Sequence, residues 1–86
     1  MDILFTPRFT KQYRKLTRAQ QEAADTALRR FQEDPFQPSL RNHALKGQLD
    51  GIRSIRAGYD LRLIYEEQGG HVIIHFLAVG THDEVY

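Results

Sequence analysis

The sequence contains no cysteine, so neither a disulfide framework nor thiol chemistry is available to this protein. No apolar run approaches the roughly 20 residues that a helix needs to cross a bilayer. The first residues, Met-Asp-Ile-Leu-Phe, lack the length and the basic flank of a secretory signal. These absences fit a reducing cytosol, and we expect a cytoplasmic protein without a membrane partner.

Several common kinds of site are also missing. The sequence has no glycine-rich phosphate loop and no serine in a nucleophile motif. One set of side chains, His43, Asp60 and His82, offers two imidazoles and a carboxylate, but without local metal-ligand spacing and among arginines that would repel a cation. We therefore expect neither a metal nor a small-molecule cofactor.

The 86 residues form one domain, 1–86, and a hydrophobic fraction of 41% is enough for a small core. The net charge is only +1, but the charges are segregated along the chain. Between Ile3 and Gln21 there is no acid and there are five basic residues: Arg8, Lys11, Arg14, Lys15 and Arg18. This pattern indicates either one basic face or an ordinary solvated helix surface.

Strand-like runs, separated by glycines, fill the second half of the chain. The breaks fall at Gly58 and at Gly69-Gly70, and the last run ends at Gly80. A Gly-Gly dipeptide favours a tight hairpin because glycine adopts positive φ easily. The runs are rich in Ile, Val, Leu, Tyr and Phe, so they predict a three-stranded antiparallel meander. The last run is apolar on both faces, which predicts the central strand.

The first half predicts a short strand over 2–6 and two helices. Thr6-Pro7 is typical of a helix start, and Thr17 with Gln20 forms a capping-box pattern that begins a second helix. The second helix must end by Asp34 because Pro35 disfavours a helical residue before it. We expect an α+β fold in which two N-terminal helices pack on one face of a four-stranded, mainly antiparallel sheet.

Two helices cover only one face of such a sheet, so the other face stays at least partly open. Alternation along the strands places the more apolar sets against the helices. Arg56 and Arg62 then project from the open face, and Arg53 reaches solvent at an edge by its long stem. Arginines are unusual inside strands, and the binding of a phosphate ligand would explain their presence here.

Three segments resemble the RelE/ParE superfamily of toxins from type II toxin–antitoxin pairs. Arg56-Ala-Gly-Tyr-Asp-Leu-Arg62-Leu-Ile-Tyr65 resembles the family's Arg-x-Gly-x-Tyr-Arg-x-x-Tyr core, and the closing Gly80-Thr-His-Asp-Glu-Val-Tyr86 also fits. His43-Ala-Leu-Lys-Gly47 is similar to a His-Pro-Leu-x-Gly segment of the YafQ-like branch. The resemblance implies a fold related to microbial ribonucleases, a cognate antitoxin as partner, and cleavage of mRNA in the ribosomal A site.

The chain also departs from both branches of that family. YafQ-like proteins tend to carry a histidine where this chain has Arg56, and RelE-like proteins an arginine where it has His82. The turn between Tyr59 and Arg62 is slightly longer than in the core pattern. The site is a hybrid, so neither branch assigns its base and its acid.

Metal-free RNA cleavage needs a base for the 2′-hydroxyl, cations for the charged phosphorane and an acid for the leaving oxygen. Histidine serves as either acid or base near neutral pH, and arginine binds phosphate with its planar fork. The catalytic candidates are His82, Asp60, His43, Arg62 and Tyr86, with Arg56, Arg62, Lys46 and Arg53 as phosphate ligands. Ordinary loop histidines, ion pairs with Asp60 or Glu66, and a frayed terminus are the simpler interpretations of the same residues.

The resemblance therefore favours a ribosome-dependent endoribonuclease toxin that needs no metal. Two alternatives remain open from the sequence. One is a ParE-like module that inhibits DNA gyrase without hydrolysis, although His43 and His82 argue against a pure binder. The other is a catalytically silent domain that binds only an antitoxin.

Overall fold

The computed structural model describes residues 1–45, 51–70 and 73–86. Within these ranges the elements are, in order, β1 (Asp2–Phe5), α1 (Pro7–Arg14), α2 (Arg18–Glu33), the 3-10 turn η1 (Pro38–Leu40), β2 (His43–Ala44), β3 (Ile52–Ala57), β4 (Leu61–Gln68), β5 (Ile73–Thr81) and α3 (His82–Val85). No helix among the described residues is long and apolar enough to cross a membrane.

Both N-terminal helices begin where the sequence predicts. The Thr6 hydroxyl accepts the Phe9 N–H at 3.1 Å, and Pro7 occupies the first helical position. In α2, the Gln20 side chain accepts the Thr17 N–H at 2.9 Å and the Thr17 hydroxyl accepts the Gln20 N–H at 3.1 Å, which completes the capping box. These bonds satisfy backbone donors that a helix start otherwise leaves without partners.

The described strands form one five-stranded sheet in the order β1-β5-β4-β3-β2. The meander from β3 to β5 is antiparallel as predicted, whereas β1 pairs with β5 in parallel. The predictions of a four-stranded sheet and of two helices are wrong by one strand and one helix. Both additions, β2 and α3, are too short to show a sequence period. The prediction that the last run is the central strand is also wrong: the middle strand is β4, and β5 is apolar on both faces because it lies inside the sheet, between β4 and β1.

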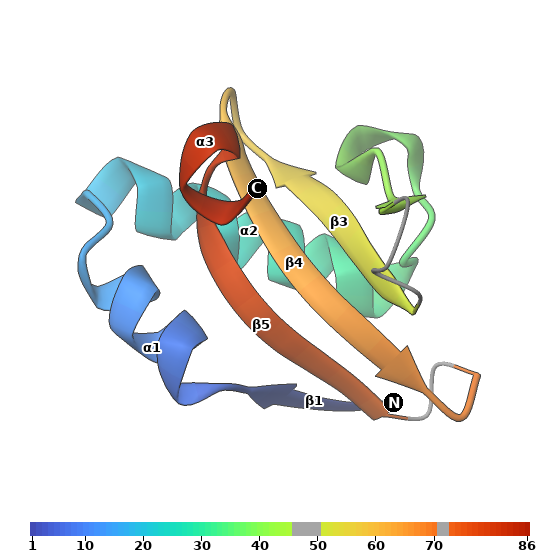
Figure 1. Cartoon of the computed structure of the whole chain (residues 1–86). Helices are drawn as coiled ribbons and strands as arrows, with labels where there is room; N and C mark the ends of the chain where they lie inside the picture. Colours follow the sequence, from blue (N-terminus) through green and yellow to red (C-terminus); the bar gives the residue numbers. More distant parts are fainter. Residues whose placement is uncertain (46–50, 71–72) are drawn as a thin grey trace.

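The helices divide between the two faces of the sheet, with α2 behind it and α3 in front in the view of Figure 1. The core lies on the α2 side, where α1 also contributes Phe9. Phe31 of α2 is fully buried and meets Tyr65 and Phe76 edge-on, with ring centroids 5.0 and 5.4 Å apart. As predicted, Leu63 and Tyr65 of β4 face this core.

A β-bulge in β5 connects the sheet to the start of α1. The pairing of β4 with β5 shifts between Ile64–Ala78 and Tyr65–Phe76, which leaves Leu77 as the extra residue. The Leu77 carbonyl accepts a hydrogen bond from the Thr6 hydroxyl at 2.9 Å. This contact fixes the first turn of α1 beside the face of the sheet that the two long helices leave open.

Candidate functional site

The open face, defined as the side of the sheet opposite α2, displays its side chains in three rows set by cross-strand pairing. The first row is Arg56, Arg62 and Gly80; the second is His43, Ser54, Ile64 and Ala78; the third is Ile52, Glu66 and His75. The first row and one end of the second are basic, and the rest of the second row is small or apolar. Across the first two rows the face is therefore divided into a basic half and an apolar half, and the third row adds the carboxylate of Glu66 and the ring of His75.

Arg41, His43, Arg56 and Arg62 line one hollow of about 300 Å³, which we call the basic hollow. Arg56 donates to the carbonyls of Gly58 at 3.2 Å and Tyr59 at 2.9 Å, so the β3–β4 turn holds its guanidinium. Arg62 donates to the Leu61 carbonyl at 3.3 Å. Within the described ranges, neither Arg56 nor Arg62 forms an ion pair. Their charges are thus available to an anionic ligand.

The ring of His43 is oriented by its own loop. Its Nδ1 lies 2.8 Å from the Arg41 carbonyl oxygen, which can only accept a hydrogen bond. In the neutral imidazole this contact places the proton on Nδ1 and leaves the Nε2 lone pair available to accept another proton. Arg41 has a left-handed backbone with φ 48°, an uncommon conformation for a residue other than glycine. The loop therefore accommodates an unfavourable conformation at the residue that fixes this histidine.

The four-residue helix α3 crosses the end of the open face, in front of β4 and β5 (Figure 1). A Cβ at Gly80 would lie 3.1 Å from Cβ of Glu84 and 3.2 Å from Cγ1 of Val85, so α3 approaches the strand closely where the residue has no side chain. The Thr81 N–H donates to the Glu84 carboxylate at 2.8 Å and lowers the pKa of that carboxyl. Because the pKa is lower in the folded state, this cap stabilises α3 fully above the ordinary pKa of glutamate, and the stabilisation is lost as the pH falls through the lowered pKa.

His82, the first residue of α3, and Tyr86, directly after its end, lie together, with ring centroids 4.6 Å apart in an edge-on arrangement. The Tyr86 hydroxyl donates to Oγ of Ser54 at 2.5 Å, and Ser54 is fully buried beneath it. Since Ser54 is the cross-strand neighbour of His43, this bond places Tyr86 next to the basic hollow. Nδ1 of His82 lies 3.4 Å from the Asp83 carboxylate, a long contact at an exposed position.

Two of the predicted site residues lie elsewhere. Asp60 is exposed in the β3–β4 turn and lines a different hollow, against the start of α2. Arg53 is on the α2 side of the sheet, where its Nε donates to the Asn42 side chain at 2.8 Å and its guanidinium stacks 5.3 Å above the ring of Phe36. Lys46, another predicted phosphate ligand, lies outside the described residues. The structure thus brings His43, Arg56 and Arg62 together and places Tyr86 beside them.

Sequence reasoning missed Arg41 and Ser54 as members of this group. Arg41 has a left-handed backbone and lies outside the strand, so the alternation of extended chain could not have placed it beside His43. Ser54 lies two residues before Arg56 in β3, so the two-residue period of a strand places both on the same face. Its bond with Tyr86 joins positions 32 apart in the sequence, and no local pattern predicts such a contact.

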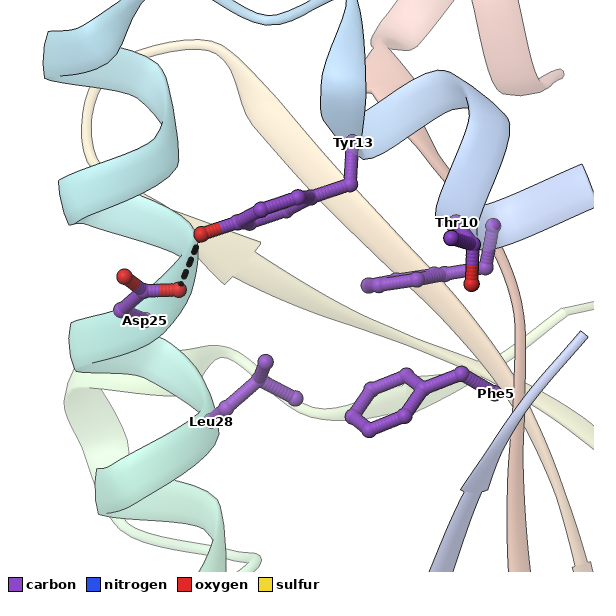
Figure 2. A pocket seen from close by; sticks show the side chains of 6 residues that line it. Phe5, Thr10, Tyr13, Asp25 and Leu28 are labelled. Atoms are coloured by element: carbon purple, nitrogen blue, oxygen red, sulfur yellow. Dashed lines mark hydrogen bonds between the residues drawn. The ribbon is translucent and has the colours of Figure 1, made fainter.

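A third hollow, of about 220 Å³, lies between α1, α2 and β1 (Figure 2). Phe5 and Leu28 line it, and the Tyr13 hydroxyl donates to the Asp25 carboxylate across its rim at 2.8 Å. That bond raises the pKa of Tyr13 and satisfies both polar groups. The hollow contains no cation, so it does not suit a phosphate ligand. No cluster of three or more potential metal-ligating side chains occurs in the part of the chain that the structure describes.

Removing the Ser54–Tyr86 hydrogen bond is expected to loosen α3 without unfolding the domain. Ser54→Ala and Tyr86→Phe should each destabilise the protein by about 1 kcal/mol. The double variant should cost clearly less than the sum, because either single change already breaks the bond. Denaturant unfolding of the wild type and the three variants measures this coupling. Additive costs would show that the two hydroxyls do not interact in solution.

A family model described as a bacterial toxin of type II toxin–antitoxin systems, YafQ, matches residues 1–86. Among curated proteins, none matches this sequence. The fold is similar to a YoeB/ParE toxin from Agrobacterium tumefaciens, with a TM-score of 0.77 and 22% identity over 95% of this chain and 99% of that one. It is also similar to YafQ from E. coli (TM-score 0.72, 19% identity, 99% and 97% of the two chains). The toxin–antitoxin complex RelBE2 from Mycobacterium tuberculosis gives a TM-score of 0.73 at 24% identity, over 94% and 96%.

Proposed function

Since this chain belongs to the YafQ family of bacterial toxins of type II toxin–antitoxin systems, we propose that it is an endoribonuclease that cleaves mRNA on the ribosome. The observation that carries the proposal is the basic hollow. It combines an oriented imidazole, that of His43, with three guanidinium groups. Proton transfer from a ribose hydroxyl requires a base within reach, and an imidazole whose Nε2 lone pair is available can serve as that base.

In the proposed reaction, Nε2 of His43 removes the proton of the 2′-hydroxyl, whose oxygen attacks the neighbouring phosphorus. The bond from the 2′-oxygen to phosphorus forms and the bond to the 5′-oxygen breaks. The leaving 5′-oxygen takes a proton from His82. The products are a 2′,3′-cyclic phosphate and a 5′-hydroxyl, and both histidines return to their starting states by exchanging a proton with solvent.

Arg62 and Arg56 serve the phosphate in this scheme. The negative charge on the non-bridging oxygens grows as the phosphorane forms, and a preorganised cation stabilises that charge. Arg56 is the more rigid of the two because the turn carbonyls hold it. Tyr86 is held beside the phosphate by Ser54 and supplies a ring on which a base can stack. Asp60 and Arg53 have no direct part in this step.

A cognate antitoxin is the proposed protein partner, and mRNA in the ribosomal A site is the proposed substrate. Support for the antitoxin comes from the family and from the fold shared with the RelBE2 complex. The three guanidinium groups of the basic hollow disfavour a bound metal cation, so the mechanism is metal-independent. The proposed site of action is the cytoplasm, where ribosomes translate mRNA.

The direct test is primer extension on an mRNA translated in a reconstituted system, with and without the protein. Cleavage only of translated message, leaving 2′,3′-cyclic phosphate ends, supports the proposal. Uncleaved message together with inhibited DNA gyrase would move the protein to the ParE-like alternative. If neither target is affected, the remaining alternative is a silent domain that binds the antitoxin.

Arg62→Ala is expected to weaken binding to RNA of any sequence, because phosphate contacts position a strand without reading its bases. The log–log dependence of the binding constant on salt should become shallower by about 0.7, the value for one phosphate contact on single-stranded RNA. The measurement is a salt titration with a short 2′-O-methyl RNA, which cannot be cleaved. Arg29→Ala removes an exposed charge from α2, behind the sheet, and should leave the slope unchanged. A wild-type slope in Arg62→Ala would exclude Arg62 from the phosphate site.

A further inference from the structure

A second hollow on the open face, of about 510 Å³, lies at its apolar half. Ile52, Ile64 and Ala78 form its floor, and Tyr86 forms part of its wall. Arg8, from the first turn of α1, also lines it. We call this hollow the apolar trough. Its floor is aliphatic and its wall is aromatic, and a single guanidinium is the charged group among the described residues that line it.

The apolar trough is continuous with the basic hollow. His43, Ser54, Ile64 and Ala78 form one cross-strand row, in which His43 lines the basic hollow and Ile64 and Ala78 line the trough. Ser54 lies between them, and its Oγ accepts a hydrogen bond from the Tyr86 hydroxyl. His43 and Ile64 are therefore two strand spacings apart, about 10 Å. A ligand held at the basic hollow has to pass Tyr86 to reach the trough.

The position of Arg8 follows from the way α1 is attached to the sheet. The Thr6 hydroxyl bonds to the carbonyl of Leu77 at the bulge, and Arg8 follows two residues later at an exposed position. The other end of the floor is different, because Glu66 is the cross-strand partner of Ile52. An anion is therefore favoured at Arg8 and disfavoured beyond Ile52.

These features match the chemistry of one nucleotide. Each of the nucleobases presents an apolar face that can stack on an aromatic ring, and the phosphate of the same nucleotide needs a cation. An apolar segment of a protein partner would use the floor, but it would not use Arg56 and Arg62 at one end and Arg8 at the other. Charge complementarity between the basic hollow and Arg8 favours a single-stranded nucleic acid.

We propose that the apolar trough is a nucleotide subsite next to the cleaved phosphate, in which a base stacks beside Tyr86 and the outer phosphate of that nucleotide binds Arg8. This inference rests on the proposed ribonuclease function, because the basic hollow has to hold the neighbouring phosphate. It adds a direction to the substrate: the strand runs from the basic hollow, over Tyr86, to the start of α1.

The test uses 2′-O-methyl RNA, which has no 2′-hydroxyl to react. We compare a dinucleotide, whose phosphate fills the basic hollow, with trinucleotides extended by one nucleotide at the 5′ or the 3′ end, each with a normal or an abasic middle residue. One of the two extensions should improve the dissociation constant by about tenfold through its added phosphate. An abasic middle residue should weaken binding by about tenfold, because it removes the base that stacks in the trough.

Arg8→Ala should remove about as much affinity for that trinucleotide as one phosphate contact provides, and it should leave the dinucleotide unchanged. Arg8→Lys should restore part of the loss. The matched control is Arg18→Ala, from the same basic stretch but at the start of α2, where Arg18 lies 3.6 Å from Glu22 on the helix surface. This control should bind both oligonucleotides as the wild type does.

Equal losses in Arg8→Ala and Arg18→Ala would overturn the subsite, because they would reduce Arg8 to a part of the general positive charge. A loss of antitoxin binding in Arg8→Ala, with RNA binding unchanged, would show that the trough binds the antitoxin and not RNA. Failure of the wild type to bind the dinucleotide would instead contradict the basic hollow as an RNA site. The proposed subsite depends on that site and would be contradicted as well. Thermal unfolding of each variant confirms that the exposed substitution leaves the fold intact.

Discussion

Replacing His43 with glutamine is expected to lower the rate of mRNA cleavage by about 10²–10⁴-fold, the usual contribution of a positioned general base. The contact of Nδ1 with the Arg41 carbonyl leaves Nε2 as the atom that takes the 2′ proton. A glutamine amide keeps the approximate size and polarity of the side chain but cannot take up that proton. Single-turnover cleavage of ribosome-bound message isolates this step from product release.

The stability of His43→Gln should remain close to that of the wild type, because His43 is exposed on the two-residue strand β2. His75→Gln is the matched control: His75 belongs to the third row of the open face, away from the basic hollow. It should cost some stability, since His75 is half-buried between β1 and β4, and change the cleavage rate much less. A wild-type rate in His43→Gln would assign the base to another group.

Local patterns were sufficient to predict most of the fold. The Thr17–Gln20 capping box marks the break between the two long helices, and Gly58 and Gly69-Gly70 mark the turns of the meander. These signals act over a few residues, so the chain itself specifies them. The parallel pairing of β1 with β5 joins residues about 70 apart, and no local signal encodes such a partner.

The site was harder to predict because it depends on contacts between elements. Alternation correctly placed Arg56 and Arg62 on one face, since a strand period of two is a local property. It gave no information on the side chains of turns and loops. Asp60 therefore remained a candidate, although the β3–β4 turn carries it towards α2. Arg53 was expected to reach solvent at an edge. However, β3 lies between β4 and β2, and Asn42 and Phe36, from the loop beside it, determine where its guanidinium lies.

The position of α3 shows how one small residue controls the site. Gly80 ends the first row of the open face and leaves room for Glu84 and Val85 to approach β5. The helix that follows then returns Tyr86 to Ser54 in the second row. Packing thus accounts for the glycine of the motif at the end of the chain, because it makes space for the groups assigned to the proposed reaction.

Replacing His82 with glutamine is expected to lower cleavage by about 10²–10⁴-fold as well, but at the opposite end of the reaction. His82 is exposed on α3 and its ring contacts that of Tyr86, so the change should preserve the fold and the antitoxin complex. The proposed role is to protonate the leaving 5′-oxygen. Single-turnover cleavage and a pull-down with the antitoxin measure the two properties separately, and Asp83→Asn tests the long contact to the ring, with a much smaller expected loss.

A substrate with sulfur in place of the 5′-oxygen separates the acid from the base. A thiolate leaves without prior protonation, so cleavage of this RNA should be nearly normal in His82→Gln. The same RNA should remain a poor substrate for His43→Gln, because its 2′-hydroxyl still needs a base. If the sulfur substrate rescues His43→Gln instead, the two roles are reversed, and rescue of neither variant would contradict the assignment of His82 as the acid. Full cleavage of ordinary message by His82→Gln would remove His82 from the chemistry, and the proton for the leaving group would have to come from another group on the open face.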